Sequence, residues 1–413
     1  MKKQSNTPKI RFHNYKELWE CDDLKNIFGT IRNAFVGTAT PYYVEKGHFY
    51  LESNNVKNGK INYNSQIFIN DEFYEKQRDR WLKTNDIVMV QSGHVGHTAV
   101  IPKELNNTAA HALIVFTDYK KEVNPHFLNY QFQSSSKRKK LDLISTGNTI
   151  KHILASEMKS FKMDFPTVEE QSAIGSLFRT LDALLTSYKD NLANYQSLKG
   201  AMLSKMFPKA GEVVPEIRLD GFEREWKKSK LKDVAHRVQG NDGRMDLPTL
   251  TISASSGWMN QIDRFSANIA GKEQKNYTLL KKGELSYNHG NSKLAKYGVV
   301  FELQDYEEAL VPKVYHSFRV NQLADSKFIE IMFSTKIPDR ELGKLVSSGA
   351  RMDGLLNISF DDFMNIAIII PTIEEQQAIG AYFSILDNLI ATHQEKISQL
   401  ETLKKKLLQD MFI

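Results

Sequence analysis

The chain of 413 residues contains one cysteine, Cys21, which excludes both an intrachain disulfide framework and a cysteine-based zinc cluster. Such low cysteine usage is typical of a reducing compartment. The longest purely aliphatic stretch is 366–370, far too short to span a membrane. Residues 1–12 carry lysines with no apolar run behind them, so we expect no secretory signal. These absences predict a cytoplasmic protein that does not contact a membrane.

The motifs on which common kinds of catalysis depend are also missing. There is no Gly-x-x-x-x-Gly-Lys-Ser/Thr, no Gly-x-Gly-x-x-Gly, no His-Glu-x-x-His and no Asn/Asp-Pro-Pro-Tyr/Phe, the last being expected of an amino-methyltransferase. His94 and His97 lie three residues apart, but no cysteine or acidic partner accompanies them. We therefore expect no enzyme active site, no metal and no cofactor bound by this chain.

The composition is that of an ordinary globular protein with a mild basic excess. Lys and Arg number 55 against 49 Asp and Glu, which gives a net charge of +6, and 41% of the residues are hydrophobic. This apolar content excludes a disordered chain. The positive balance indicates some preference for polyanions.

An internal repeat organises the chain. Residues 166–207 align without a gap to 371–412, and 17 of the 42 positions are identical. A weaker similarity precedes each copy, where Pro-Lys-Ile-Arg-Phe at 8–12 matches Pro-Glu-Ile-Arg-Leu at 215–219, each followed by a tryptophan. The segments between these blocks show no convincing similarity. The pattern suggests one task carried out twice on two different targets.

Each copy of the long repeat is predicted to be a helix. Thr167 and Thr372 can cap the first turns, and a glutamate three residues later would complete a capping box. Apolar residues then recur at heptad spacing, which is typical of a two-helix coiled-coil seam. The predicted seam consists of Ile174, Leu177, Leu181, Leu184, Tyr188, Tyr195, Leu198 and Met202 in the first helix and Ile379, Tyr382, Leu386, Leu389, Leu400, Leu403 and Leu407 in the second.

The seam has a polar middle, formed by Asn191, His393 and Lys396. These residues either fix the register of the two helices or loosen the seam. The connecting segment 208–370 leaves the end of the first helix and enters the start of the second, so one compact domain there requires antiparallel helices. Helices of about 40 residues would form a rod of roughly 60 Å, which spans between one and two turns of B-DNA.

The two connecting segments are predicted to be mixed α/β domains. Strands are expected at 86–90, 98–101 and 113–116 in the first, and at 249–253, 284–287, 298–302 and 315–320 in the second, with 366–370 as a buried strand before the second helix. The predicted fold class is α+β. Two globular domains, at 1–165 and 208–370, are separated by helices at 166–207 and 371–413, and the halves are related by a pseudo-two-fold (cyclic) repeat.

One polar loop stands out in each domain. Glycines let a backbone approach a partner closely, and amide, hydroxyl, imidazole and ammonium groups can address base edges. The alternative is an ordinary polar turn. The residues concerned are Gln91, Ser92, Gly93, His94 and His97 in the first domain and Asn288, His289, Asn291, Ser292, Lys293 and Lys296 in the second.

A second pair of loops precedes the long helices. Both combine small hydroxyl residues, a glycine and a cation, which suits a phosphate contact. These loops contain Thr146, Asn148 and Lys151 in the first half and Ser348 and Arg351 in the second. The basic run just upstream is either a solvated face or a further phosphate contact, and it consists of Lys137, Arg138, Lys139 and Lys140.

The repeated helix motif Pro-Thr-x-Glu-Glu-Gln-x-x-Ile-Gly-x-x-Phe-x-x-Leu-Asp resembles the specificity subunit of type I restriction-modification systems (HsdS) over the whole chain. Residues 37–43, Gly-Thr-Ala-Thr-Pro-Tyr-Tyr, are similar to a common opening of that family's target-recognition domains. The second domain departs from it, with Gln-Gly-Asn-Asp-Gly-Arg at 239–244, so it resembles a different recognition class. Arg244 is added to the predicted DNA contacts.

The resemblance implies a non-catalytic subunit that binds double-stranded DNA. Each recognition domain would read one half of a split asymmetric target, and the helices would set the spacer. The implied partners are two methyltransferase subunits, which bind S-adenosylmethionine, and two restriction subunits, which use ATP and Mg²⁺. Docking of the methyltransferase subunits is expected on the helix flanks and the Glu-Glu-Gln turns, unless these turns only cap the helices: Glu169, Glu170, Gln171, Glu374, Glu375 and Gln376.

Two alternatives remain at this point. The partner could be a single polypeptide that fuses methyltransferase and nuclease. The chain could also be a coiled-coil scaffold whose two globular domains bind proteins instead of DNA. A free-standing methyltransferase or nuclease is disfavoured by the missing motifs.

Overall fold

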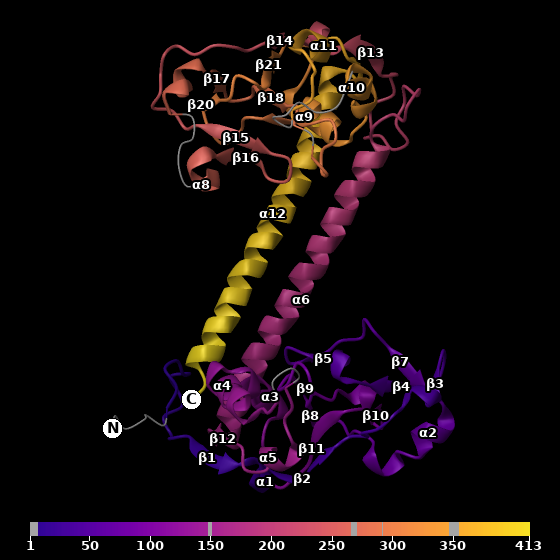
Figure 1. Cartoon of the computed structure of the whole chain (residues 1–413), viewed down its shortest axis with the longest axis vertical. Coiled ribbons are helices and arrows are strands. Elements are labelled where there is room, and N and C mark those ends of the chain that lie inside the picture. The colour runs from indigo at the N-terminus through magenta and orange to yellow at the C-terminus, as the bar shows by residue number, and fades with distance from the viewer. Residues whose placement is uncertain (1–6, 148–150, 266–270, 291, 347–354) are drawn as a thin grey trace. The chain divides into compact units, whose positions relative to one another are not determined.

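The computed structural model describes residues 7–147, 151–265, 271–290, 292–346 and 355–413. The chain forms two compact units, one of 1–189 with 395–413 (unit 1) and one of 190–394 (unit 2). The two long helices are α6 (Val168–Lys205) and α12 (Ile373–Asp410), and each has 38 residues (Figure 1). Each unit thus contains the start of one long helix and the end of the other. The predicted division into four domains separated the helices from the globular domains, whereas the units join them.

A four-stranded antiparallel sheet with the same strand order lies in both units. The order is β2-β11-β8-β9 in unit 1 and β14-β21-β18-β19 in unit 2. Six predicted strands, three in each unit, fall on β8, β9 and β11 and on β18, β19 and β21 to within a few residues, whereas the first strands, β2 and β14, were not predicted. Their bounds are β2 (Phe28–Asn33), β8 (Ile87–Val90), β9 (Thr98–Val100), β11 (Leu113–Tyr119), β14 (Ala235–Arg237), β18 (Leu285–Asn288), β19 (Val299–Glu302) and β21 (His316–Val320).

A two-stranded sheet in each unit joins the start of that half to the strand before its long helix. In unit 1, β1 (Glu20–Asp23) pairs with β12 (Lys162–Phe165), and in unit 2, β13 (Lys227–Lys230) pairs with β22 (Ala367–Ile370), both antiparallel. The similar segments that open the two halves, each ending in a tryptophan, therefore lead into equivalent strands, β1 and β13.

The remaining strands differ between the units, as the lack of sequence similarity there would suggest. Unit 1 has a sheet β10-β4-β7-β3 and a hairpin β5–β6, whereas unit 2 has the pairs β15–β16 and β17–β20. The bounds are β3 (Tyr43–Val44), β4 (His48–Leu51), β5 (Val56–Lys57), β6 (Lys60–Ile61), β7 (Ile67–Ile69), β10 (Ala109–Ala110), β15 (Leu250–Ser253), β16 (Gly257–Asn260), β17 (Thr278–Lys281) and β20 (Glu308–Val311).

Short helices cover the sheets. They are α1 (Leu24–Ile27), α2 (Asp71–Glu75), α3 (Pro125–Gln133), α4 (Ser135–Ile144), α5 (Ala155–Met158), α7 (Leu231–Val234), α8 (Gln261–Phe265), α9 (Ser326–Ser334), α10 (Asp339–Leu345) and α11 (Phe360–Met364). No helix within the described ranges is long and apolar enough to cross a membrane.

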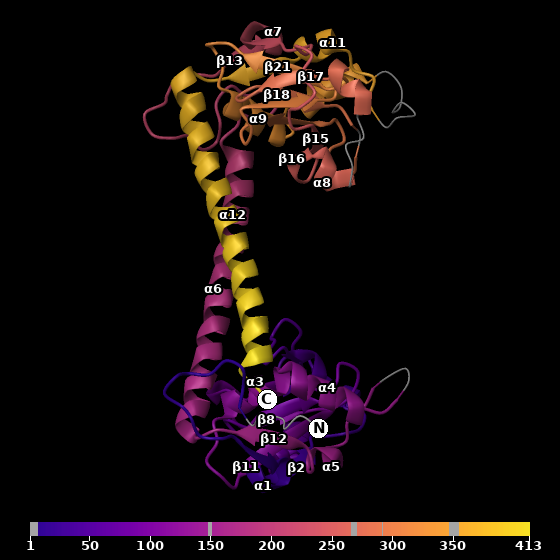
Figure 2. The same ribbon diagram turned by 90° about the vertical axis from the view of Figure 1, so that its left-hand side faces the viewer.

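An aromatic cluster marks the core of each unit where the end of a long helix meets the start of a half. In unit 1, Trp19, Phe127 and Phe412 have ring centroids 5.6–6.4 Å apart. The C-terminal residues lie beside α3 and α4 of this unit (Figure 2). In unit 2, the same cluster is made by Trp226, Phe328 and Phe207, with centroids 5.5–5.7 Å apart. Buried aromatic groups of this size dominate core energetics.

The long helices run antiparallel within each unit, as predicted. In unit 1, Lys404 donates to Asp182 Oδ1 at 2.7 Å and Lys189 donates to Glu401 Oε1 at 2.6 Å. In unit 2, Lys199 pairs with Asp387. Asp182 and Asp387 are equivalent in the repeat, and so are Lys404 and Lys199. In each unit, an ion pair between equivalent residues therefore joins the two long helices.

Most of the predicted seam positions are buried or half-buried, but three leucines are exposed and do not form a buried seam. Leu184, Leu198 and Leu403 are 42%, 38% and 44% exposed. In unit 1 the buried positions are instead Phe178 and Leu185, because this part of α6 packs on its own domain and follows the 3.6-residue helical period. The other predicted positions are buried or half-buried: Ile174, Leu177, Leu181, Tyr188, Tyr195, Met202, Ile379, Tyr382, Leu386, Leu389, Leu400 and Leu407.

The polar middle of the seam is only partly enclosed. Asn191 and Lys396 are exposed. His393 is half-buried, donates from Nδ1 to Leu389 O at 2.8 Å, and has its ring 5.1 Å from that of Tyr195. Of the three, His393 is the residue that contributes to the packing of the helix pair in unit 2.

Candidate nucleic-acid interface

A buried arginine–glutamate pair fixes the start of each half to its long helix. Arg11 donates from Nε and Nη2 to both carboxylate oxygens of Glu170, at 2.7 and 2.6 Å. Arg218 binds Glu375 in the same way and at the same distances, and Trp226 Nε1 also donates to Glu375 at 3.3 Å. Glu170 and Glu375 are 0% and 1% exposed. Bidentate pairs of this kind are strong and geometrically specific.

The glutamine that follows each glutamate binds the main chain of the domain. Gln171 accepts from the N–H of Asn124 at 3.0 Å, and Gln376 accepts from the N–H of Asp325 at 3.0 Å. Asn124 and Asp325 are the N-caps of α3 and α9. At Gly175 a Cβ would lie 2.9 Å from Asn124 Oδ1, so the glycine allows this close approach.

These contacts correct two predictions about the Glu-Glu-Gln turns. The side chains of Glu170, Gln171, Glu375 and Gln376 are buried and bound inside their own units, so they are not available to dock a partner. Glu170 also does not complete a capping box, because its carboxylate is taken by Arg11, although its N–H donates to Thr167 Oγ1 at 3.4 Å. The exposed Glu169 and Glu374 remain as predicted docking residues.

Replacing Glu170 by glutamine should lower the free energy of unfolding of unit 1 by about 3–5 kcal/mol, since it leaves Arg11 without its buried counter-charge. Glu375→Gln should do the same to unit 2. Denaturant unfolding of the full chain measures both effects. Glu169→Gln, one residue away and exposed, is the matched control and should change stability by less than about 0.5 kcal/mol. Equal, small effects of all three variants would contradict the assigned role.

The two predicted loops of the first domain lie together in unit 1. Ser92 forms a β-bridge with His152, the N–H of Gly93 donates to Lys151 O at 3.1 Å, and the N–H of Ile153 donates to Gln91 O at 2.9 Å. Gly93 and His94 are exposed at the tip. Two segments chosen separately for base and phosphate contacts thus form one paired surface.

Helix α4 brings the basic run to this surface but buries one of its lysines. Lys137 is fully buried, forms an ion pair with Asp164 and donates to Lys162 O at 3.1 Å, so the predicted phosphate contact is wrong for this residue. Arg138 is half-buried and donates from Nη2 to His97 Nδ1 at 3.2 Å. Lys139 and Lys140 are exposed. Only the second half of the basic run 137–140 is therefore exposed to solvent.

His97 is also held inside the domain. Its Nδ1 accepts from the N–H of Asn58 at 3.2 Å in addition to Arg138. Burial and the neighbouring Arg138 lower the pKa of His97 to about 4, so the ring is neutral at pH 7. His97 therefore supports the loop, and it is not one of the side chains exposed for base contact. The exposed residues form recognition surface 1: Gly93, His94, Lys139, Lys140, Thr146 and Lys151.

In unit 2 the first predicted loop pairs with Leu355 and Leu356, while the second predicted loop lies outside the described residues. Gly290 forms a β-bridge with Leu355, and the N–H of Leu356 donates to His289 O at 2.8 Å. His289 itself is buried, with Nδ1 and Nε2 at 2.8 and 2.9 Å from the carbonyl oxygens of Leu356 and Val314, so its predicted base contact is wrong. The exposed residues are Ser292, Lys293 and Lys296, which form recognition surface 2.

Two further predicted residues of unit 2 have partners inside the domain. Asn288 donates to Ile252 O at 3.3 Å and accepts from the N–H of Gly290 at 3.1 Å. Arg244 donates to Asp242 at 2.8 Å and to Glu308 at 2.6 Å, and both carboxylates raise its pKa. Because two carboxylates balance its charge, Arg244 adds no net positive charge for a phosphate.

Four predicted contacts lie outside the described residues: Asn148, Asn291, Ser348 and Arg351. Sequence reasoning missed the Arg11, Asn124 and Lys60 contacts altogether. The Arg11 contact could have been found, because an arginine recurs at the equivalent position 218 in the second half. In the part of the chain that the structure describes, no three His, Cys, Asp or Glu side chains are grouped as metal ligands.

Comparison with known proteins shows which family this chain resembles. The model of the type I restriction modification DNA specificity domain matches residues 37–194 and 223–402. The type I restriction enzyme EcoBI specificity subunit of Escherichia coli is 24% identical over 223 residues, and the MjaVIII specificity subunit of Methanocaldococcus jannaschii is 21% identical over 276. These alignments cover 52% and 63% of this chain, and 47% and 64% of the relatives.

The fold is shared with a solved structure. The crystal structure of the type I restriction-modification S subunit from M. genitalium superposes with a TM-score of 0.60, covering 98% of this chain and 99% of that one at 14% sequence identity. At this identity the likeness concerns the fold. The two matched segments, which make up more than half of the chain, show that it belongs to the family of type I restriction modification DNA specificity domain proteins.

Proposed function

We propose that this chain is the DNA sequence-specificity subunit of a type I restriction-modification complex, and that each unit reads one half of a split, asymmetric target. The observation that carries the proposal is the paired-loop surface found in both units. In unit 1 the pairing of Ser92 with His152 joins the two predicted DNA-contacting loops, and in unit 2 the pairing of Gly290 with Leu355 joins the first predicted loop to the segment that begins at Leu355. The first loops follow equivalent strands, β8 and β18, but carry different side chains. Two readers with one framework and different surfaces suit a target whose halves differ.

The chain is proposed to be non-catalytic and cytoplasmic. S-adenosylmethionine would be bound by two methyltransferase subunits, and ATP with Mg²⁺ by two restriction subunits where they are present. A partner that fuses methyltransferase and nuclease would use the same specificity subunit. α6 and α12 would together set the spacer between the half-targets.

The exposed flanks of the long helices are proposed as the methyltransferase docking sites. Leu198 in unit 2 and Leu403 in unit 1 are equivalent in the repeat, and both are exposed although they are large and apolar. Each lies one residue before the lysine of the interhelical ion pair, at Lys199 and Lys404. Two equivalent apolar positions with the same neighbours suit two copies of one partner.

Co-expression with neighbouring methyltransferase genes, followed by methylome sequencing, tests the proposal. The expected result is a split, asymmetric motif that is methylated only when this chain is present. A folded complex with a methyltransferase partner that produces no new modified motif would overturn it.

Lysines of recognition surface 1 should contribute to the salt dependence of DNA binding. Removing one phosphate contact, by Lys139→Gln, Lys140→Gln or Lys151→Gln, should reduce the slope of log K against log [salt] by about 0.9. Titrations of a target duplex at several salt concentrations measure this slope. Lys103→Gln, an exposed lysine of the 3₁₀ helix Lys103–Leu105 outside this surface, is the control and should leave the slope unchanged. If all four variants had the same slope, the three lysines would not be phosphate contacts.

A further inference from the structure

The segment Asn58–Lys60 lies against both α3 and the middle of α6. Asn58 and Gly59 form the turn between β5 and β6, and Lys60 begins β6; the three residues are called the Asn58–Lys60 turn. Asn58 and Gly59 have φ values of +52° and +83°, as a two-residue hairpin turn of the primed type requires. A Cβ on Gly59 would lie 2.3 Å from Nε2 at the flexible end of Gln133, which would have to move, and the φ of +83° by itself favours glycine at this position. Asn129 of α3 donates to Gly59 O at 2.9 Å.

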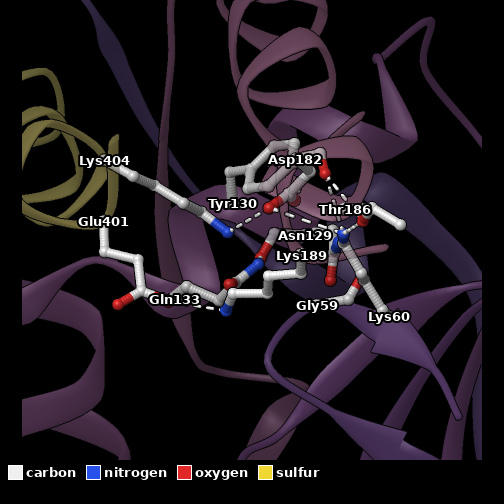
Figure 3. Close-up of polar contacts among 10 residues, drawn as sticks. All are labelled: Gly59, Lys60, Asn129, Tyr130, Gln133, Asp182, Thr186, Lys189, Glu401 and Lys404. Atoms are coloured by element: carbon white, nitrogen blue, oxygen red, sulfur yellow. Dashed lines mark hydrogen bonds and ion pairs between the residues drawn. The ribbon is translucent and has the colours of Figure 1, made fainter. Parts of the chain in front are cut away.

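Lys60 binds this turn to the long helix α6 through hydrogen bonds. Its ammonium group donates to Asp182 O at 3.2 Å and to Thr186 Oγ1 at 3.1 Å, as Figure 3 shows. Two acceptors on consecutive turns of α6 define both the position and the direction of the lysine side chain. A hydrogen bond with a charged donor is stronger than one between neutral groups.

The same aspartate joins this contact to the helix pair. The Asp182 carboxylate accepts from Tyr130 Oη at 2.8 Å and from Lys404 of α12 at 2.7 Å, and its Oδ1 lies 3.7 Å from the Lys60 ammonium (Figure 3). Its side chain is 9% exposed. One buried carboxylate thus attracts a lysine of the recognition domain and a lysine of the second long helix.

At its other end, the turn supports the recognition loop. The N–H of Asn58 donates to His97 Nδ1, and Gly59 forms a β-bridge with Ala99. His97 ends the loop that begins at Gln91, and the N–H of Val90 donates to His97 O at 2.8 Å. The three residues of the turn therefore connect the loop to α6.

Unit 2 has the helix pair but lacks a counterpart of this turn among its described residues. Lys199 and Asp387 pair as Lys404 and Asp182 do. Beside them lies an open pocket of about 270 Å³, which Glu330, Ser334 and Leu294 also line. The N-caps of α3 and α9 are equivalent, so Glu330 and Ser334 correspond to Asn129 and Gln133, the residues that contact Gly59 in unit 1.

We propose that the Asn58–Lys60 turn is a positioning element that holds the Gln91–His97 loop at a fixed place on α6, with Lys60 as its positioning residue. This inference rests on the proposed function, because the loop would read the first half-target. The reading of the first half-target then depends on a contact that the second half-target does not need.

The test compares Lys60→Met with Lys189→Met in the full chain. Lys189 also forms an ion pair on α6, with Glu401, but does not contact the recognition domain in any described interaction. Hydrogen exchange of the amides of Val90, Gly93 and Gly96 should become about tenfold faster in Lys60→Met and stay unchanged in Lys189→Met, the size expected for the loss of charge-assisted hydrogen bonds. Thr186→Val removes an acceptor from the helix side and should be less than additive with Lys60→Met.

A measurement of DNA discrimination distinguishes a failure of this inference from a failure of the proposed function. In the methyltransferase complex, Lys60→Met should lower discrimination against changed base pairs in the first half-target about tenfold and leave the second unchanged. Lys60→Arg, which keeps the charged donor, should restore most of the discrimination. Unchanged amide exchange in Lys60→Met overturns the positioning role. A wild-type complex that discriminates neither half-target overturns the proposed function instead.

Discussion

Exchanging residues 24–165 for the first recognition domain of another type I specificity subunit should change one half of the methylated target and leave the other half unchanged. Two of the contacts that hold the exchanged domain do not depend on its side chains, whereas Lys60 and Tyr130 reach Asp182 through side chains that the foreign domain has to supply. Arg11 and Glu170 both lie outside the exchanged segment, and Gln171 binds the N–H of residue 124 and not a side chain. A foreign domain with the same sheet order and with equivalents of these two side chains can therefore be accepted.

Methylome sequencing of cells that express the hybrid with its methyltransferase measures the result. The reciprocal exchange of residues 231–370 is the matched control and should change the other half-target only. A hybrid that alters both halves at once would contradict the independence of the two readers.

Inserting seven residues into α6 alone, after Asp190, should abolish methylation, whereas the same insertion combined with one in α12 after Gln394 should lengthen the spacer. The single insertion cannot keep both the Lys189–Glu401 pair of unit 1 and the Lys199–Asp387 pair of unit 2. The double insertion keeps both. Seven helical residues add about 10 Å, which corresponds to about three base pairs.

The spacer is again measured by methylome sequencing. Circular dichroism of both variants serves as the control for helix content, which should be at least that of the wild type in the double variant. A double insertion that methylates a target with the original spacer would refute the role of the helices as a ruler.

Much of the architecture could be predicted from local patterns. The two copies of the Pro-Thr-x-Glu-Glu-Gln segment predicted both long helices to within two or three residues of their ends, and chain connectivity predicted that they run antiparallel. The strands were found because short β-rich runs are bounded by glycine and polar residues, as at 86–90 and 98–101. These signals depend only on neighbouring residues.

The candidate site was predicted less well, because burial depends on distant residues. Lys137 looked like part of an exposed basic run, but Asp164 of strand β12 supplies a buried counter-charge. His289 looked like a base-reading residue, but both of its ring nitrogens meet carbonyl oxygens from Val314 and Leu356. Nothing at positions 137 or 289 alone distinguishes these environments from an exposed loop.

The last residues of the chain belong to the core of the first unit, and this has a consequence for synthesis. Unit 2 consists of one continuous stretch, 190–394, whereas unit 1 needs 395–413 and places Phe412 between Trp19 and Phe127. On the ribosome, the second unit can therefore complete its core while the first still lacks an aromatic ring. The unit whose residues are translated first is completed last, and a stop codon shortly before Met411 would remove Phe412 from the core of unit 1, where its ring packs against Trp19 from near the start of the sequence.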